Sequence, residues 1–285
     1  MHPRPLAATL VGLALLAAGC TTGPDRHAGP GATGPSPTRA ALDAMDPDAR
    51  AVAERVVRFV GGAEALDGVR TMEVRFEGES DGNPIAFHLA WSRSDAGWHF
   101  MQLGPDAGVM GTDGEAFWYQ DEGEQAELYE IDPDEQFGMR EQADQVLEFV
   151  SFPLDVVNPS GSHAAPAQPM HAHGEDEFKG QRASVLSPIA APGPEDAMFW
   201  HYYDPQTGRP LGVTQGLPSE PLYMAFSDWR EVEGGSGLKM FHRVTVDGFW
   251  LGSEVFDLRA SFVRVNTLDE SDFEPPADAV LQTDG

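Results

Sequence analysis

The sequence is poor in cysteine and in basic residues. Its 285 residues include one cysteine, and 18 lysines and arginines stand against 46 aspartates and glutamates. A single thiol forms no intrachain disulfide, so the folded chain must be stabilised by a packed core. The formal net charge of −28 repels nucleic acid. We therefore expect no DNA-binding or RNA-binding function.

Long apolar runs are also absent, apart from one stretch near the N-terminus. Residues 6–18 are mostly apolar, and Arg4 supplies a positive charge before them. The stretch is too short to span a bilayer as a helix but suits a secretory signal peptide. It ends in Leu16-Ala-Ala-Gly-Cys20, which resembles the bacterial lipobox. We therefore predict a lipoprotein signal peptide over residues 1–19.

Cys20 is then the predicted lipid-attachment residue, which explains why an exported chain has one cysteine. The lipid would anchor the protein to a membrane of the cell envelope, facing the periplasm. Thr21 follows the cysteine in place of an acidic residue that retains lipoproteins in the inner membrane, so we expect the outer membrane.

Two sequence motifs match patterns of enzyme active sites, but the residues around each do not predict the structure that the motif requires. Gly29–Gly34 fits G-x-G-x-x-G, but a proline-rich segment offers neither the strand nor the helix that a dinucleotide site needs. Gly78–Gly82 fits G-x-S-x-G, but the flanking patterns predict two strands rather than a strand and a helix. We expect no catalytic residues, no cofactor and no enzymatic activity.

Histidines are concentrated in one part of the chain. His163, His171 and His173 precede a run of acidic residues and could in principle ligate zinc or copper. They fall in a segment rich in proline and alanine, which we predict to be a loop over 158–174. Nothing in that pattern fixes a ligand geometry, so we favour a solvated polar loop and predict no metal site.

The tether and the helices follow from composition and spacing. Residues 20–45 are rich in glycine, proline and alanine, which predicts a flexible tether before a single domain over 46–285. Asp46 and Pro47 then favour a helix start, and apolar residues at helical spacing continue to Val60. A second helix is predicted over 133–150.

Alternation of apolar and polar residues predicts many short strands. They are expected at residues 71–77, 85–91, 97–103, 108–112, 115–120, 126–131, 178–187, 197–204, 210–216, 222–233, 238–247 and 253–265. Short turns between them indicate an antiparallel meander. The fold class is therefore mainly β with a few helices.

Aromatic residues gather in these strands. Phe87, Leu89 and Trp91 share one face of their strand, as do Trp200 and Tyr202 of theirs. These five are the candidate ligand-binding residues if they line a cavity. The alternative is that both faces of the sheet are covered core, and the sequence leaves the two possibilities open.

Three segments resemble the Lol-type lipoprotein carrier superfamily. They are Gly61–Met72, Tyr203–Pro210 and Val265–Pro276. The resemblance implies an incomplete antiparallel β-barrel, or half-barrel, that is closed by helices and holds acyl chains on its apolar interior. No ligand-gating residue of the carrier aligns with a position of this chain.

The first hypothesis is therefore a lipid-anchored envelope protein that binds an acyl chain or a lipoprotein in the half-barrel. The alternative is an envelope sensor or protein-interaction module without a lipid ligand. Burial of apolar surface would drive the first, at about 0.8 kcal/mol per methylene.

Overall fold

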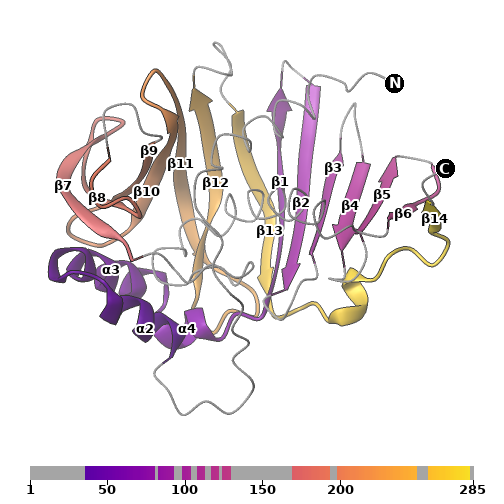
Figure 1. The fold of residues 1–285 in the computed structure, drawn as a ribbon, viewed down its shortest axis with the longest axis horizontal. Coiled ribbons are helices and arrows are strands. Elements are labelled where there is room, and N and C mark those ends of the chain that lie inside the picture. Colours follow the sequence, from indigo (N-terminus) through magenta and orange to yellow (C-terminus); the bar gives the residue numbers. More distant parts are fainter. Residues whose placement is uncertain are drawn as a thin grey trace.

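The computed structural model describes residues 36–80, 83–92, 98–103, 108–112, 117–121, 124–129, 169–192, 198–248 and 256–282. These residues form one large sheet with helices α2 (Pro37–Ala44), α3 (Pro47–Val60) and α4 (Ala63–Asp67). Figure 1 shows the three helices together at one end of the sheet. No helix in the described ranges is long and apolar enough to cross a membrane.

The sheet has 14 strands and stays open. The strands are β1 (Thr71–Ser80), β2 (Asn83–Ser92), β3 (Trp98–Leu103), β4 (Gly108–Thr112), β5 (Phe117–Asp121), β6 (Glu127–Tyr129), β7 (His171–Phe178), β8 (Gln181–Ser187), β9 (Met198–Tyr203), β10 (Pro210–Leu217), β11 (Glu220–Glu231), β12 (Lys239–Gly248), β13 (Phe256–Val265) and β14 (Val280–Gln282).

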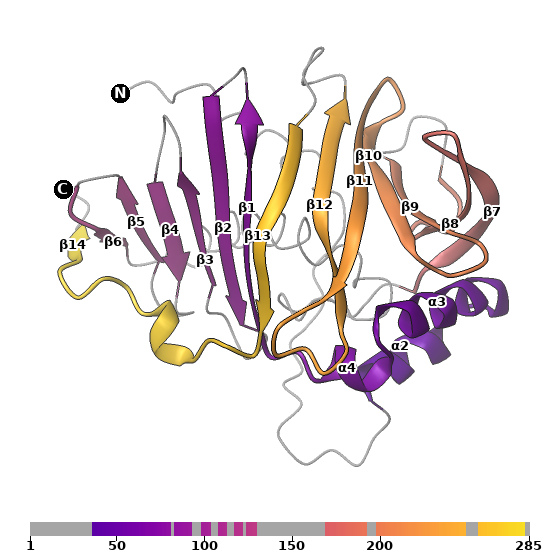
Figure 2. The ribbon, with the colours of Figure 1, turned by 180° about the vertical axis from the view of Figure 1, so that it is seen from behind.

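Their order across the sheet is β14-β6-β5-β4-β3-β2-β1-β13-β12-β11-β10-β9-β8-β7. Neighbours are antiparallel except β14 and β6, which run parallel. The two outermost strands, β14 and β7, do not pair with each other, and the sheet curls most strongly at the β7–β10 end (Figures 1 and 2). The predicted fold class, a mainly β, incompletely closed antiparallel sheet with a few helices, is confirmed.

Helix α3 begins where the sequence predicted. A side-chain oxygen of Asp46 accepts hydrogen bonds from the N–H groups of Asp48 and Ala49, at 3.0 and 2.9 Å. Pro47 occupies the first turn, where its missing N–H leaves no intrahelical bond unmade. Val52, Val56 and other apolar residues of one helix face are buried in the main core.

Helix α2 corrects the predicted tether, which was placed over residues 20–45. Ser36 caps this helix, Pro37 occupies its first turn, and Leu42 is buried in the main core. Thr38 donates its N–H and its hydroxyl to Asp67 at the end of α4, at 3.1 and 2.7 Å. The last part of the proposed tether therefore belongs to the folded domain, because one buried leucine and one polar contact outweigh its composition.

The predicted helix over 133–150 lies outside the described residues. The loop predicted over 158–174 is wrong at its end, because β7 begins at His171. This outermost strand is largely exposed from Gly174 to Glu177, so His171–Phe178 buries no alternating apolar set.

The ends of β1 and β13 are joined by an asparagine. Asn266 has a positive φ of 58°. Its side-chain oxygen accepts the N–H of Arg70 at 2.7 Å, and its amide donates to the carbonyl of Gly68 at 3.0 Å. Residues almost two hundred positions apart are thereby fixed beside α4.

The C-terminus of α3 lies against the turn between β11 and β12. A Cβ added to Gly61 would lie 2.5 Å from the carbonyl oxygen of Gly237, whereas one added to Gly62 would have open space. Both glycines have positive φ, at 121° and 96°. The close approach at Gly61 sets how α3 sits on the sheet.

Replacing each glycine with alanine separates backbone strain from packing. We expect Gly62→Ala to lower the free energy of unfolding by about 1–2 kcal/mol, since only the left-handed backbone is disfavoured. Gly61→Ala should cost a further 1–3 kcal/mol or so, because the β11–β12 turn must move. Urea denaturation of both variants measures the difference, and equal losses would contradict the packing described here.

Candidate functional site

One face of the sheet is apolar across most of its strands. We call it the inner face, defined by the strand residues that pack in the same core as α3. Its buried members include Met72, Val74, Phe76, Leu89, Leu186, Tyr203, Val213, Leu222, Met224, Phe226, Phe241, Val244, Val246, Leu258, Val263 and Val265. The register places these side chains opposite one another from strand to strand, as at Val74, Leu89 and Val263. The opposite side is called the outer face.

Two of the predicted ligand-binding residues belong to the inner face. Leu89 is buried opposite Val74, and Phe87 is partly buried opposite Phe76. Trp91 lies on the same strand, with its backbone opposite Met72. Its side chain lies outside the described part of the structure. The predicted alternation of β2 is therefore correct for Phe87 and Leu89.

Trp200 and Tyr202 belong to the outer face instead. They pack in a second, smaller core with Phe178, Val185 and Leu211. Tyr202 stacks on Phe178, with ring centres 4.6 Å apart. The five predicted residues thus do not form one cavity, because the β7–β10 end is covered on both faces and aromatics occur on each.

The inner-face residues of β9 are the ones that sequence reasoning passed over. Phe199, His201 and Tyr203 alternate with the two predicted aromatics, and Val213 lies opposite His201. The hydroxyl of Tyr203 and Nδ1 of His201 are 3.3 Å apart, and both residues are buried. Because all five residues from Phe199 to Tyr203 are aromatic or histidine, the sequence pattern alone could not show which alternate residues face α3.

Burial makes His201 a neutral residue. Removal from water lowers the pKa of His201 from 6.5 to about 3. The imidazole therefore hydrogen-bonds without charge beside the apolar inner face. A neutral polar group that is hydrogen-bonded can be buried beside apolar side chains at a small cost in free energy, whereas an unpaired charged group costs much more.

Two of the three histidines in the predicted loop, His171 and His173, lie on β7. Nε2 of His173 lies 2.9 Å from the carbonyl of Ile189, and its ring meets that of Trp200 at 4.6 Å. Nδ1 of His171 lies 3.8 Å from Asp46 at the start of α3. Within the described ranges, no three histidine, cysteine or acidic side chains come together in a way that could hold a metal. His163 lies outside those ranges.

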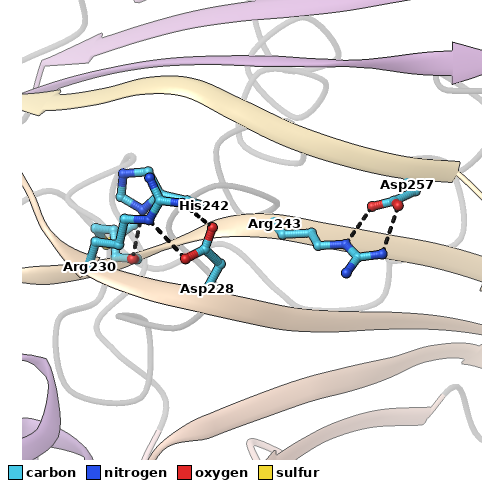
Figure 3. Close-up of polar contacts among 6 residues, drawn as sticks. Asp228, Arg230, His242, Arg243 and Asp257 are labelled. Carbon is cyan, nitrogen blue, oxygen red and sulfur yellow. Dashed lines mark hydrogen bonds and ion pairs between the residues drawn. The ribbon is translucent and has the colours of Figure 1, made fainter.

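The outer face of β11–β13 carries charges that pair with each other (Figure 3). Arg243 donates two hydrogen bonds to Asp257, at 2.7 and 2.8 Å, and they lower the pKa of that carboxyl. Nε of Arg230 donates to Asp228 at 2.8 Å and lowers the pKa of Asp228 in the same way. These exposed groups satisfy one another, so we place the candidate site on the inner face.

The three segments that resemble the carrier superfamily lie together where helices α2–α4 meet the sheet, which we call the helical end. Gly61 meets the β11–β12 turn, and Asn266 binds the segment that leads from α4 to β1. Gly208, in the β9–β10 turn, lies against the backbone of α3, where a Cβ would be 2.4 Å from the carbonyl carbon of Arg55. These segments therefore hold the helices against the sheet.

Comparison with solved structures finds matches among bacterial proteins. A domain of an outer membrane lipoprotein-sorting protein from Vibrio parahaemolyticus is 13% identical, covering 83% of this chain and 97% of its own, with a TM-score of 0.42. A LolA superfamily protein from Nitrosomonas europaea is 11% identical, covering 80% of this chain and 97% of its own, with a TM-score of 0.44.

A complex of MucA and MucB from Pseudomonas aeruginosa also matches. It is 13% identical over 83% of this chain and 64% of its own, with a TM-score of 0.26. No family model matches the chain, and neither does any curated protein sequence.

The pKa of His201 predicts how stability depends on pH. Below pH 6.5 the unfolded chain binds a proton at this residue and the folded chain does not. Its stabilising contribution is therefore complete above pH 6.5 and is lost as the pH falls toward 3. Between pH 7.5 and pH 5 we expect His201 alone to lower the free energy of unfolding by about 2 kcal/mol.

Urea denaturation at both pH values tests this prediction. His201→Gln keeps a neutral hydrogen-bonding side chain but cannot titrate, so its loss of stability between the two pH values should be smaller than that of the native chain by the same amount. An unchanged pH dependence in the variant would show that His201 is protonated in the folded protein.

Proposed function

We propose that the protein is a lipid-anchored component of the bacterial cell envelope whose inner face binds an acyl chain. The observation that carries this proposal is that the apolar inner face extends over more strands than α3 contacts. Contacts of α3 with the sheet are concentrated on β7 and β12. The apolar face continues beyond them through β13, β1 and β2.

That continuation has the size of an acyl chain. Four neighbouring strands, from β12 to β2, span about 14 Å at a strand spacing of roughly 4.8 Å. Val244, Val74 and Leu89 lie along this path and are already buried in the folded chain, so an acyl chain contacts them only by displacing what covers them. Burial of ten methylenes would contribute roughly 8 kcal/mol, which corresponds to a Kd of about 1 μM before the cost of ordering the ligand.

The envelope location depends on Cys20, as the signal peptide and the lipobox-like segment suggest. A lipid at Cys20 would hold the domain at the membrane surface, and we place it at the outer membrane, facing the periplasm. The role is binding rather than catalysis, with a hydrophobic molecule or the acyl group of a lipoprotein as the partner.

A fluorescent fatty acid, titrated into the full-length protein, tests the binding site. Phe87→Ala removes a half-buried ring from the inner face and should weaken probe binding by about 1–3 kcal/mol. Trp200→Ala removes a ring from the outer face and should leave the affinity unchanged. Denaturation of the same two variants provides the control.

If Phe87 is only core, its truncation should cost about 3–5 kcal/mol of stability without changing the affinity of the folded fraction. That result would remove Phe87 from the site. If no apolar probe binds the native protein, the acyl-chain proposal fails and the protein-interaction alternative becomes the better one.

Lipid attachment is tested separately by Cys20→Ser. We expect this variant to lose the covalent diacylglycerol and to leave the detergent phase, because no other thiol is present. Intact-mass spectrometry of the native and variant proteins measures the change. A diacylglycerol mass retained by the variant would refute attachment at Cys20.

A further inference from the structure

Aromatic and cationic side chains meet where α3 approaches the β11–β12 turn. Phe59 of α3 contacts the ring of Trp229, with ring centres 5.4 Å apart. The ammonium of Lys239 lies 5.7 Å from the centre of the Phe59 ring. Arg55 lies one helical turn before Phe59 on the same side of α3. We call these four residues the cationic junction, and Figure 2 shows the helix and the turn side by side.

The cations of this junction have no acidic partners in the described part of the chain. Neither Arg55 nor Lys239 makes an ion pair there, and Glu231 makes none although it lies opposite Lys239 in the register. By contrast, the described basic residues of α2, of the first turn of α3 and of most of the sheet are ion-paired. These are Arg39, Arg50, Arg75, Lys179, Arg182, Arg230, Arg243, Arg259 and Arg264.

The contrast matters because acidic residues outnumber basic ones 46 to 18. With so many carboxylates available, most arginines find one, and those left unpaired are not scattered. Three more arginines also lack an ion pair in the described ranges: Arg58 on α3, Arg70 after α4, and Arg209, which follows Gly208 where that glycine lies against α3. These unpaired basic residues therefore cluster around α3 and its contacts with the sheet, although residues 36–70 hold six acidic residues against five basic ones.

Two N–H donors of the junction also lack acceptors. Nε of Arg55 and Nε1 of Trp229 are buried and make no hydrogen bond with the described protein. Buried donors cost free energy unless an acceptor reaches them. Arginine and lysine donors around an aromatic ring are groups that bind an anionic oxygen attached to an apolar body.

We propose that the cationic junction binds the anionic headgroup, of the phosphate class, of an amphiphile whose acyl chain lies on the inner face. This inference rests on the proposed function and adds the ligand's charge. Trp229 and Phe241, which lie opposite each other in the register, lead from the junction into the inner-face core. The headgroup would meet Arg55 and Lys239 at the helical end, and the chain would run toward β1 and β2.

Calorimetry of the full-length protein with three probes tests the proposal. The probes are a lysophosphatidylglycerol, a monoacylglycerol with the same acyl chain, both below their micellar concentrations, and inorganic phosphate. We expect the lysophosphatidylglycerol to bind at least tenfold more tightly than the monoacylglycerol. Raising the salt concentration should reduce this preference, because it depends on charge.

The variants Arg55→Gln and Lys239→Gln should each reduce the preference at least threefold and leave monoacylglycerol binding unchanged. Lys239→Arg keeps the charge and should keep the preference. Arg182→Gln is the matched control, since Arg182 is exposed on β8 and pairs with Glu175. This control should bind all probes as the native protein does.

The outcomes distinguish failure of the acyl-chain function from failure of the headgroup site. If neither lipid binds, the acyl-chain function fails. If both lipids bind equally, the function stands and the headgroup site is refuted. Phosphate that binds as tightly as the lysolipid would also refute it, because the acyl chain would then contribute nothing. A Lys239→Gln variant that loses thermal stability but keeps the lipid preference would show that Lys239 only stabilises the C-terminus of α3.

Discussion

The burial of one face of an open sheet is the constraint on which this structure depends. Because successive side chains of a strand point to opposite faces, the register carries a single apolar surface from β2 across to β8. A closed barrel would bury that surface by itself. Here the sheet is open, so its inner face must be covered by helices, by other parts of the chain or by a ligand, and this requirement links the fold to the proposed function.

The helices are held at one end of this surface by backbone contacts rather than by charge. Gly61 and Gly208 let the C-terminus of α3 and its interior at Arg55 come close to turns of the sheet, and Asn266 ties α4 to the end of β13. With α3 fixed in this way, Phe59 contacts Trp229 and lies near the ammonium of Lys239, one helical turn after Arg55. The same packing that closes one end of the core therefore gathers the unpaired cations.

Local patterns in the sequence predicted most of the elements. The cap and periodicity of α3 and the alternation of β1 and β2 are properties of neighbouring residues, so they could be read directly. The helix at Pro37–Ala44 could not, because it depends on contacts made by Thr38 and Leu42 with distant parts of the chain. The strand at His171–Phe178 lacks an alternating apolar pattern because most of its side chains are exposed at the edge of the sheet.

The candidate site was predicted only in part, for the same reason. Phe87 and Leu89 alternate with smaller or polar residues, so their common face was evident. In β9 every residue from Phe199 to Tyr203 is aromatic or histidine, and periodicity alone cannot assign the two faces. The pairing of Lys239 with an aromatic ring of α3 joins residues far apart in the chain, and no local pattern reports it.

Native mass spectrometry of the gently purified full-length protein tests the central claim most directly. If the inner face binds an acyl chain, a fraction of the molecules should carry a lipid beyond the one attached at Cys20, and collisional activation should release it. Phe87→Ala should reduce that fraction relative to Trp200→Ala. A protein that carries only its covalent lipid under gentle conditions, and takes up none when lipid is added, would contradict the account.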